Sequence, residues 1–216
     1  MPNEKNQILY QCLAGAFCTI VLISNILSAK MVKLPYLDNF LIPAGLIFYP
    51  LTFLLSDLIT EIFGLQRAKL TIYTALGLNL LSYAIIQLVL FMPTATLKEE
   101  SAFQAILGLS SLRIFSSLVA FISAQIIDIQ LYAMIKRWTG GRFLWMRSNG
   151  STWVAQIVDT IAIDILYLYF GLHMPLSQVV PIMLFSFAYK ALFSIAGTPL
   201  FYLAVSFIRK RRMLDT

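Results

Sequence analysis

The chain has 216 residues, of which 59% are hydrophobic and only 12% are charged, and its formal net charge is +6. Soluble domains carry about 45–50% apolar and about 25% charged residues, so this composition excludes a soluble enzyme, a nucleic-acid-binding domain and a disordered protein. Six membrane spans of about 22 residues would occupy about three fifths of the chain. The composition therefore indicates a compact membrane protein with short connections.

Six apolar segments are long enough to cross a bilayer, and they predict an all-α polytopic membrane protein, a bundle of six transmembrane helices. A span of about 22 residues forms about 33 Å of helix, enough to cross with some tilt. The connections are short, so residues 1–216 are expected to form a single membrane domain. The predicted spans cover about residues 8–29, 40–63, 70–92, 112–135, 152–173 and 179–207.

The distribution of Lys and Arg predicts the orientation. With a cytoplasmic N-terminus, the inner loops and ends hold 11 of these residues, the outer connections hold four, and Lys190 lies within a span. Cytoplasmic loops of membrane proteins carry an excess of Lys and Arg. Both termini are therefore expected to be cytoplasmic.

Six charged side chains lie inside the predicted spans. Each costs about 2.5–3.5 kcal/mol at a helix centre on insertion scales. Such residues normally face the bundle interior, pair with one another or line a pathway, so we expect functional residues among them. The six are Asp57, Glu61, Asp128, Asp159, Asp164 and Lys190.

Four polar side chains are expected at one depth. Counted from the inner ends of the predicted spans, Asp57, Asn79, Asp128 and Asp159 fall about 9–14 Å into the bundle. Carboxylates and an amide from four helices at one depth predict a polar chamber. The alternative is that these groups hydrogen-bond the helices to one another, as buried amides in membranes do.

The fourth and fifth spans share a local pattern, SAQIID and VAQIVD. In each, an amide precedes a carboxylate by three residues, Gln125 with Asp128 and Gln156 with Asp159, which places both on one helical face. The two spans run antiparallel, so the pattern suggests a weak inverted repeat. A carboxylate and an amide together can accept and donate hydrogen bonds at a guanine-like edge. Aromatic side chains available to stack on such a heterocycle are Phe48, Tyr49, Tyr83, Tyr167 and Tyr189.

Two further charged pairs have open interpretations. Asp57 and Glu61 are four residues apart on one face, and either contacts a substrate, carries a coupling proton or pairs with the basic loop that follows. Asp164 and Lys190 both lie near the midplane of their spans. They are expected to form a buried ion pair, unless Lys190 contacts the ligand or is displaced by a cationic one.

Proline residues are expected to interrupt two of the spans. Pro43 and Pro50 lie within the second span and Pro199 within the sixth. Proline removes a helical hydrogen bond and clashes with the preceding turn, so it breaks or kinks the helix. The freed carbonyl groups must then be buried or line a cavity.

The sequence contains no recognisable enzyme or cofactor motif. The single histidine, His173, lies at an outer helix end, and neither a P-loop nor a metal-binding spacing of Cys and His is present. We therefore expect no enzyme activity, no cofactor and no bound metal. Transport would use an ion gradient, facilitated diffusion or a separate ATPase module.

Three stretches of the chain resemble one family of membrane transporters. They are PLTFLLSDLITEIFGLQRAK, SAQIIDIQLYAMIKRWTGGRFLWMRSNGSTWVAQIVDT and AYKALFSIAGTPL, and they resemble the queuosine-precursor transporters of the vitamin-uptake transporter group. The resemblance implies a six-helix protein of the inner (cytoplasmic) membrane. It also implies import of 7-deazaguanine bases for salvage of the tRNA nucleoside queuosine, with no direct contact to nucleic acid. The candidate bases are cyano-deazaguanine, aminomethyl-deazaguanine and queuine.

The family motifs coincide with most of the polar residues identified above. This chain departs from the family at Ala155, where Ser is frequent, and at Thr60, where Asn is common. We expect one group to bind substrate: Asp57, Asn79, Gln125, Asp128, Gln156, Asp159 and Lys190. A second group is expected to have a coupling or structural role: Asn25, Lys30, Glu61, Arg113, Arg147 and Asp164.

Other kinds of function remain open from the sequence. One is a substrate-binding membrane subunit that needs an ATPase partner, as in energy-coupling-factor transporters. An intramembrane enzyme would need a nucleophile with a positioned base, which no spacing supplies. In a purely structural subunit, neutralising the buried carboxylates would affect only assembly. Besides the deazaguanine substrate and membrane lipid, an ATPase module or a second copy of the chain is a possible partner.

Overall fold

The computed structural model describes residues 4–28, 30–33, 41–93, 104, 107, 111–171 and 173–214. Helices dominate these residues, and a two-stranded sheet is the one exception within them. The elements in chain order are α1 (Glu4–Leu27), β1 (Met31–Lys33), β2 (Leu41–Pro43), α2 (Gly45–Phe48), α3 (Pro50–Phe63), α4 (Leu65–Leu90), α6 (Ser111–Trp138), α7 (Leu144–Ile163), the π-helix η1 (Asp164–Gly171) and α8 (Leu176–Leu214).

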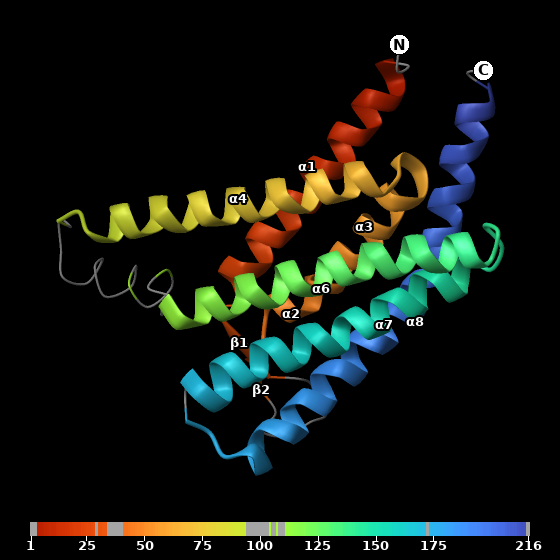
Figure 1. Ribbon diagram of the computed structural model, residues 1–216. Helices are drawn as coiled ribbons and strands as arrows, with labels where there is room; N and C mark the ends of the chain where they lie inside the picture. Colours follow the sequence, from red (N-terminus) through yellow and green to blue (C-terminus); the bar gives the residue numbers. More distant parts are fainter. Residues whose placement is uncertain are drawn as a thin grey trace.

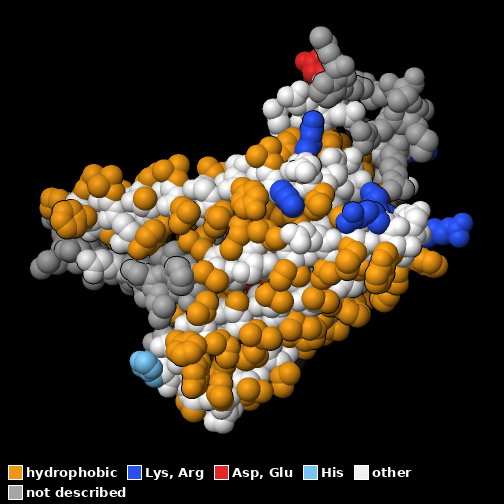
Figure 2. All heavy atoms as spheres, in the orientation of Figure 1, with side chains coloured by type: hydrophobic (Ala, Val, Ile, Leu, Met, Phe, Trp, Pro, Cys, Tyr) orange, Lys and Arg blue, Asp and Glu red, His pale blue; other side chains and the backbone are white. Residues whose placement is uncertain are grey.

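Within the described residues, six helical segments are long and apolar enough to cross a membrane, which confirms the predicted six-span bundle. The α2 and α3 helices together form the second of these segments, and α7 with η1 forms the fifth. The start of α1 and the end of α8 lie at the same end of the bundle (Figure 1). We call this the terminal end. The Lys and Arg side chains visible in Figure 2 also lie toward it, whereas hydrophobic side chains cover the length of the helices.

The fifth span begins earlier than predicted. The α7 helix starts at Leu144 instead of Thr152, because the segment RSNGS, which reads as a polar loop, is helical and buried. Arg147, the charged residue of this segment, is only 1% exposed. The carboxylate of Glu61, on another helix, neutralises its charge. The sequence around Arg147 does not reveal this partner.

The all-α prediction missed a small antiparallel sheet between the first and second spans. Strand β1 pairs with β2 in the register Met31 with Pro43 and Lys33 with Leu41. The predicted second span therefore starts with a strand, and its helix begins only at Gly45. Lys30 lies just before β1, where its side chain is exposed and its carbonyl accepts the Ala44 N–H at 2.8 Å.

The α3 helix lies at the centre of the bundle. It contacts α1, α4, α6, α7 and α8, and ten of its 14 residues are buried. One apolar cluster around Ile59 joins α3 to α1, α4 and α6. A second cluster, around Leu58, joins it to α6 and α8. Polar groups on the remaining face of α3 are thereby enclosed on all sides.

Proline interrupts the second span as predicted. The α2 helix ends at Phe48, and α3 starts with Pro50 in its first turn, where the missing N–H costs little. Tyr49 stands at the break, and its carbonyl accepts the Thr52 hydroxyl at 2.7 Å. Pro199 lies within a continuous α8, and Figure 1 shows this helix bending along its course.

A close approach between α1 and α2 requires glycine at position 45. A Cβ atom there would overlap the carbonyl oxygen of Ser24 and the hydroxyl of Ser28. We expect Gly45→Ala to lower the free energy of unfolding by about 1–3 kcal/mol, because a backbone atom would have to move. Thermal unfolding of the purified protein tests this. Gly77→Ala, in open space on α4, should instead raise stability by up to about 1 kcal/mol.

Candidate functional site

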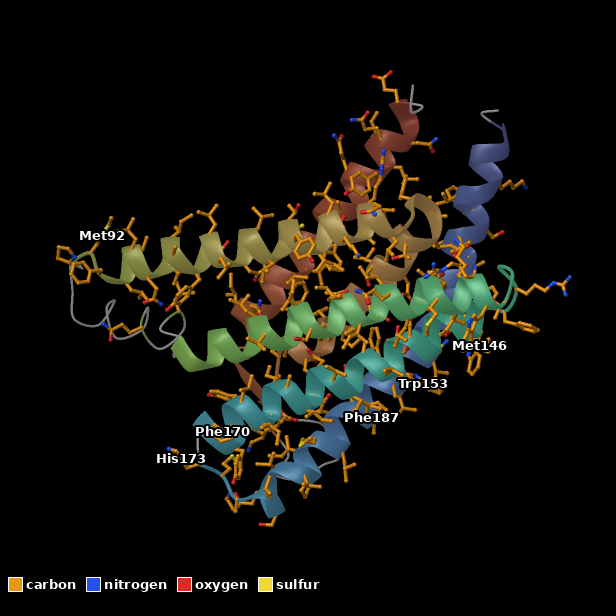
Figure 3. The ribbon with its side chains drawn as sticks, viewed as in Figure 1. Met92, Met146, Trp153, Phe170, His173 and Phe187 are labelled. Carbon is orange, nitrogen blue, oxygen red and sulfur yellow. The ribbon has the colours of Figure 1, made fainter. Side chains whose placement is uncertain are left out.

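Polar side chains of α3, α6, α7 and α8 meet along the axis of the bundle at successive levels. We call these three levels the ion network, the aspartate pair and the Lys190 site. The ion network lies nearest the terminal end. In Figure 3 Met146 marks the terminal end of α7, while Phe170 and His173 mark the opposite end of the same span. His173 is thus distant from the polar residues. The described residues contain no group of three or more His, Cys, Asp or Glu side chains able to hold a metal ion.

The ion network consists of Glu61, Tyr132, Lys136 and Arg147. The Glu61 carboxylate receives Arg147 Nη2 at 2.8 Å, Lys136 Nζ at 2.9 Å and the Tyr132 hydroxyl at 3.0 Å. Arg147 also donates from Nη1 to the carbonyl of Gly141 at 2.7 Å. A buried charge with this many partners ties α3, α6 and α7 together at the terminal end. These contacts support a structural role for Glu61 and Arg147.

The aspartate pair consists of Asp57 on α3 and Asp128 on α6, both fully buried. Ser148 donates to Asp57 Oδ2 at 2.5 Å, and Thr152 donates to Asp128 Oδ1 at 3.4 Å. Ser56, the residue before Asp57, donates to Asp128 Oδ2 at 3.3 Å. Among the ion pairs formed by described residues, none involves either aspartate. Among the described residues, the hydrogen bonds to the pair come from hydroxyl groups.

In each of the two glutamines of the repeated pattern, the amide nitrogen has a hydrogen-bond partner and the amide oxygen has none among the described residues. Gln125 donates its Nε2 to the Thr52 hydroxyl at 3.2 Å, and Gln156 donates its Nε2 to the Lys190 carbonyl at 3.4 Å. Both residues are 0% exposed, yet neither Oε1 atom receives a hydrogen bond from any described residue. A buried acceptor without a donor costs about 1–3 kcal/mol. These two oxygen atoms, at matching positions of the repeated pattern, are available to accept hydrogen bonds.

The Lys190 site consists of Lys190, Asp159 and Tyr49. Lys190 Nζ lies 2.6 Å from Asp159 Oδ2, and the Tyr49 hydroxyl donates to Asp159 Oδ1 at 3.0 Å. The ammonium group also lies 5.7 Å from the centre of the Tyr49 ring and contacts Thr160 at 3.2 Å. The prediction that Lys190 pairs with Asp164 is wrong: Asp164 begins the π-helix, and its Oδ2 has no partner among the described residues.

The prediction of a single polar layer is also wrong. Because α7 begins at Leu144, Asp159 lies 15 residues, or about 22 Å, from the start of its helix. Asp57 contacts Ser148, whereas Asp159 contacts Tyr49, and these partners place the two carboxylates at different levels. The polar residues therefore form a column along the axis of the bundle.

Asn79 lies outside this column, between α1, α4 and α6. Its Oδ1 accepts Asn25 Nδ2 at 2.7 Å, and its Nδ2 donates to the Ala75 carbonyl at 2.8 Å. Asn25 in turn accepts the Ser117 hydroxyl at 3.0 Å. These contacts occupy both ends of the Asn79 amide and support the helix-joining alternative for both asparagines.

We accordingly expect Asn79→Ala to weaken the bundle without changing substrate affinity. The loss of one interhelical amide contact should cost about 0.5–2 kcal/mol of stability. A thermal shift assay together with a substrate saturation curve checks this. A large rise in the substrate concentration needed for half-maximal uptake, at unchanged stability, would instead place Asn79 in the binding site.

The sequence alone missed several partners in the column. Ser148 and Thr152 fell in or beside a predicted loop, and Tyr132 and Lys136 gave no signal because their partner, Glu61, is more than 70 residues away. Tyr49 was anticipated only as a stacking aromatic residue. Arg113 belongs to α6, but its side chain lies outside the described part of the chain.

Comparisons with known proteins place the chain in a family. Residues 43–204, three quarters of the chain, match the family described as "Putative vitamin uptake transporter". A protein of Bacillus subtilis (strain 168) named "Probable queuosine precursor transporter" is 28% identical over 148 residues, which cover 68% of this chain and 65% of the relative. The match thus spans somewhat less than two thirds of the relative's length. No solved structure matches significantly. Because the family match covers three quarters of the chain, including α3, α6, α7 and most of α8, the chain belongs to the vitamin uptake transporter family.

Proposed function

We propose that this chain imports 7-deazaguanine precursors of queuosine through the polar column between α3, α6, α7 and α8. The observation that carries the proposal is the set of buried acceptor oxygens that lack donors among the described residues. The amide and carboxylate oxygens of this kind are Gln125 Oε1, Gln156 Oε1, Asp57 Oδ1 and Asp164 Oδ2. A ligand that fits them must be rich in N–H donors.

A 7-deazaguanine base has this character. It presents a ring N–H and an exocyclic amine on one edge, a further N–H on the five-membered ring, and one carbonyl acceptor. Gln125 and Gln156 would accept N–H groups and hold the base in orientation. The Asp128 and Asp159 carboxylates, at different levels of the column, would accept from separate donor edges of the base. Tyr49 and Phe53, whose ring centres lie 5.8 Å apart, flank this region and provide apolar surface for the ring face.

The charged groups at the three levels of the column have distinct proposed roles. Lys190 neutralises Asp159, and a cationic substituent on the ligand would compete with it for that carboxylate. Asp57, which has no cation partner among the described residues, would bind such a substituent or carry a coupling proton. The ion network would close the column at the terminal end.

The proposed setting is the cytoplasmic membrane, with both termini in the cytoplasm. The bias of Lys and Arg supports this orientation, and the start of α1 and the end of α8 lie at one end of the bundle (Figure 1). A substrate-binding subunit driven by an ATPase partner remains the second candidate within the same family.

Queuosine in tRNA provides the test. Cells that lack queuosine synthesis and their own precursor transporter would express this chain, with the downstream enzymes present. They would receive cyano-deazaguanine, aminomethyl-deazaguanine or queuine at low concentration. The proposal predicts that at least one precursor restores queuosine, and that Asp159→Asn abolishes the rescue at equal abundance in the membrane. If no precursor rescues, an ATPase module is co-expressed. If queuosine is restored only when the ATPase module is present, the result would favour the second candidate. If no precursor restores queuosine even then, both candidate functions would be refuted.

A further inference from the structure

An open pocket of about 640 Å³ lies at the terminal end, where Arg147 of the ion network forms part of its wall. It is formed where the loop between α6 and α7 meets the last turns of α8. One wall comes from the start of α7 and the other from α8. The lining residues relevant here are Phe143, Leu144 and Arg147 on the first wall and Tyr202, Ser206 and Lys210 on the second.

The pocket is positively charged. Lys210 carries a full charge and belongs to a run of four basic residues in the sequence, 209–212. Arg147 and Lys136 together bind one carboxylate, that of Glu61, so this group joins two basic side chains to one acidic side chain. The first turn of α7 adds the positive end of a 20-residue helix. The described residues that line the pocket include no acidic side chain.

Hydroxyl groups in the pocket are arranged as donors. The α7 N-cap residue, Phe143, offers no side-chain cap, and the Trp145 N–H instead donates to the Tyr202 hydroxyl oxygen at 2.9 Å. This bond uses an acceptor site of the hydroxyl and leaves its proton available to a second group. The Ser206 hydroxyl lines the same wall. The pocket therefore offers O–H and N⁺–H donors together, which suits the oxygen atoms of a phosphate group.

Exposed aromatic residues place the pocket at the edge of the bilayer. Trp138 is 82% exposed, Phe143 68% and Trp145 47%, and all three lie at or beside the turn that forms the pocket. Aromatic side chains, Trp and Tyr above all, gather where the hydrocarbon region meets the lipid headgroups. A phosphate in this pocket would thus lie at headgroup depth. The acyl chains of a phospholipid bound through that phosphate could run along the apolar surface of α7 and α8 seen in Figure 2.

We propose that this pocket binds the phosphate headgroup of an anionic phospholipid. The headgroup would bridge α8, through Lys210 and Tyr202, to the start of α7. Basic pockets between transmembrane helices are a recurring form of headgroup site. The proposal is independent of the transported substrate, because none of the orphan acceptors of the column lines the pocket.

Native mass spectrometry of the full chain, released from detergent with added lipid, tests the proposal. The probes are phosphatidylglycerol and, as the zwitterionic comparison, phosphatidylcholine. We expect the protein to retain phosphatidylglycerol preferentially, and Lys210→Gln to reduce its retention about fivefold, the effect of about one basic contact. Tyr202→Phe should reduce retention less, because it removes a neutral donor.

Arg137→Gln is the matched control, since Arg137 is an exposed basic residue at the same end that does not line the pocket. It should leave lipid retention unchanged. Equal retention of the two lipids would overturn the proposal. An equal loss of phosphatidylglycerol retention in Lys210→Gln and Arg137→Gln would overturn it as well. Displacement of phosphatidylglycerol by inorganic phosphate at comparable concentration would also overturn it, because the pocket would then be a site for a free anion.

Discussion

Replacing Glu61 by glutamine should lower the free energy of unfolding by about 3–5 kcal/mol, or the melting temperature by about 6–20 °C. The variant leaves Arg147, which is 1% exposed, buried without its carboxylate partner. Lys136 is 35% exposed and can turn toward water, but Arg147 cannot. Thermal unfolding of the purified protein, followed by intrinsic fluorescence, measures the effect.

Two further variants show whether the loss comes from the ion pair. Glu4→Gln removes an exposed carboxylate at the start of α1 and should change stability by less than about 0.5 kcal/mol. The double variant Glu61→Leu and Arg147→Met removes both charges and should recover much of the loss, since a buried pair can be replaced by apolar groups. A double variant less stable than Glu61→Gln would show that the network stabilises the bundle by means other than charge pairing.

Replacing both Gln125 and Gln156 by methionine should reduce uptake about 100-fold at low substrate concentration while leaving the protein at least as stable. Each lost hydrogen bond to a ligand is worth about 1.4 kcal/mol, or tenfold in affinity. Stability should not fall, because each variant also removes a buried oxygen that has no donor among the described residues. Uptake into proteoliposomes and thermal unfolding are measured on the same preparation.

Asn149 supplies the matched control, because its buried amide is satisfied within the protein. It donates to the Thr198 hydroxyl at 2.8 Å and accepts the Ser194 hydroxyl at 2.9 Å. Asn149→Ala should therefore cost about 1–3 kcal/mol of stability and leave the substrate dependence of uptake unchanged. If the glutamine variants lost stability as Asn149→Ala does and transported normally, the orphan acceptors would have no role in binding.

The sequence predicted the bundle because hydrophobicity and span length are local properties. Six apolar segments were enough to give six spans, and buried Asp and Gln residues were enough to indicate a polar interior. The start of α7 was misplaced because the insertion of Arg147 into the bundle depends on Glu61, 86 residues earlier in the chain. No local pattern carries that information.

The partners within the column were less predictable for the same reason. Depth estimates depend on where each helix starts, and an error of eight residues in α7 moved Asp159 by about 12 Å relative to Asp57. That shift exchanged the expected partner of Lys190, which binds Asp159 rather than Asp164. The short sheet near Lys30 was missed because three-residue strands have no measurable periodicity.

Equilibrium binding of a labelled deazaguanine to the purified protein tests the central claim most directly. Tritiated cyano-deazaguanine, aminomethyl-deazaguanine and queuine would each be titrated against the parent, the Gln125→Met and Gln156→Met double variant, and Asn149→Ala. The account predicts saturable binding of at least one base to the parent and to Asn149→Ala, and about 100-fold weaker binding to the glutamine variant. Undiminished binding to the folded glutamine variant, or no binding of any base to the parent, would contradict it.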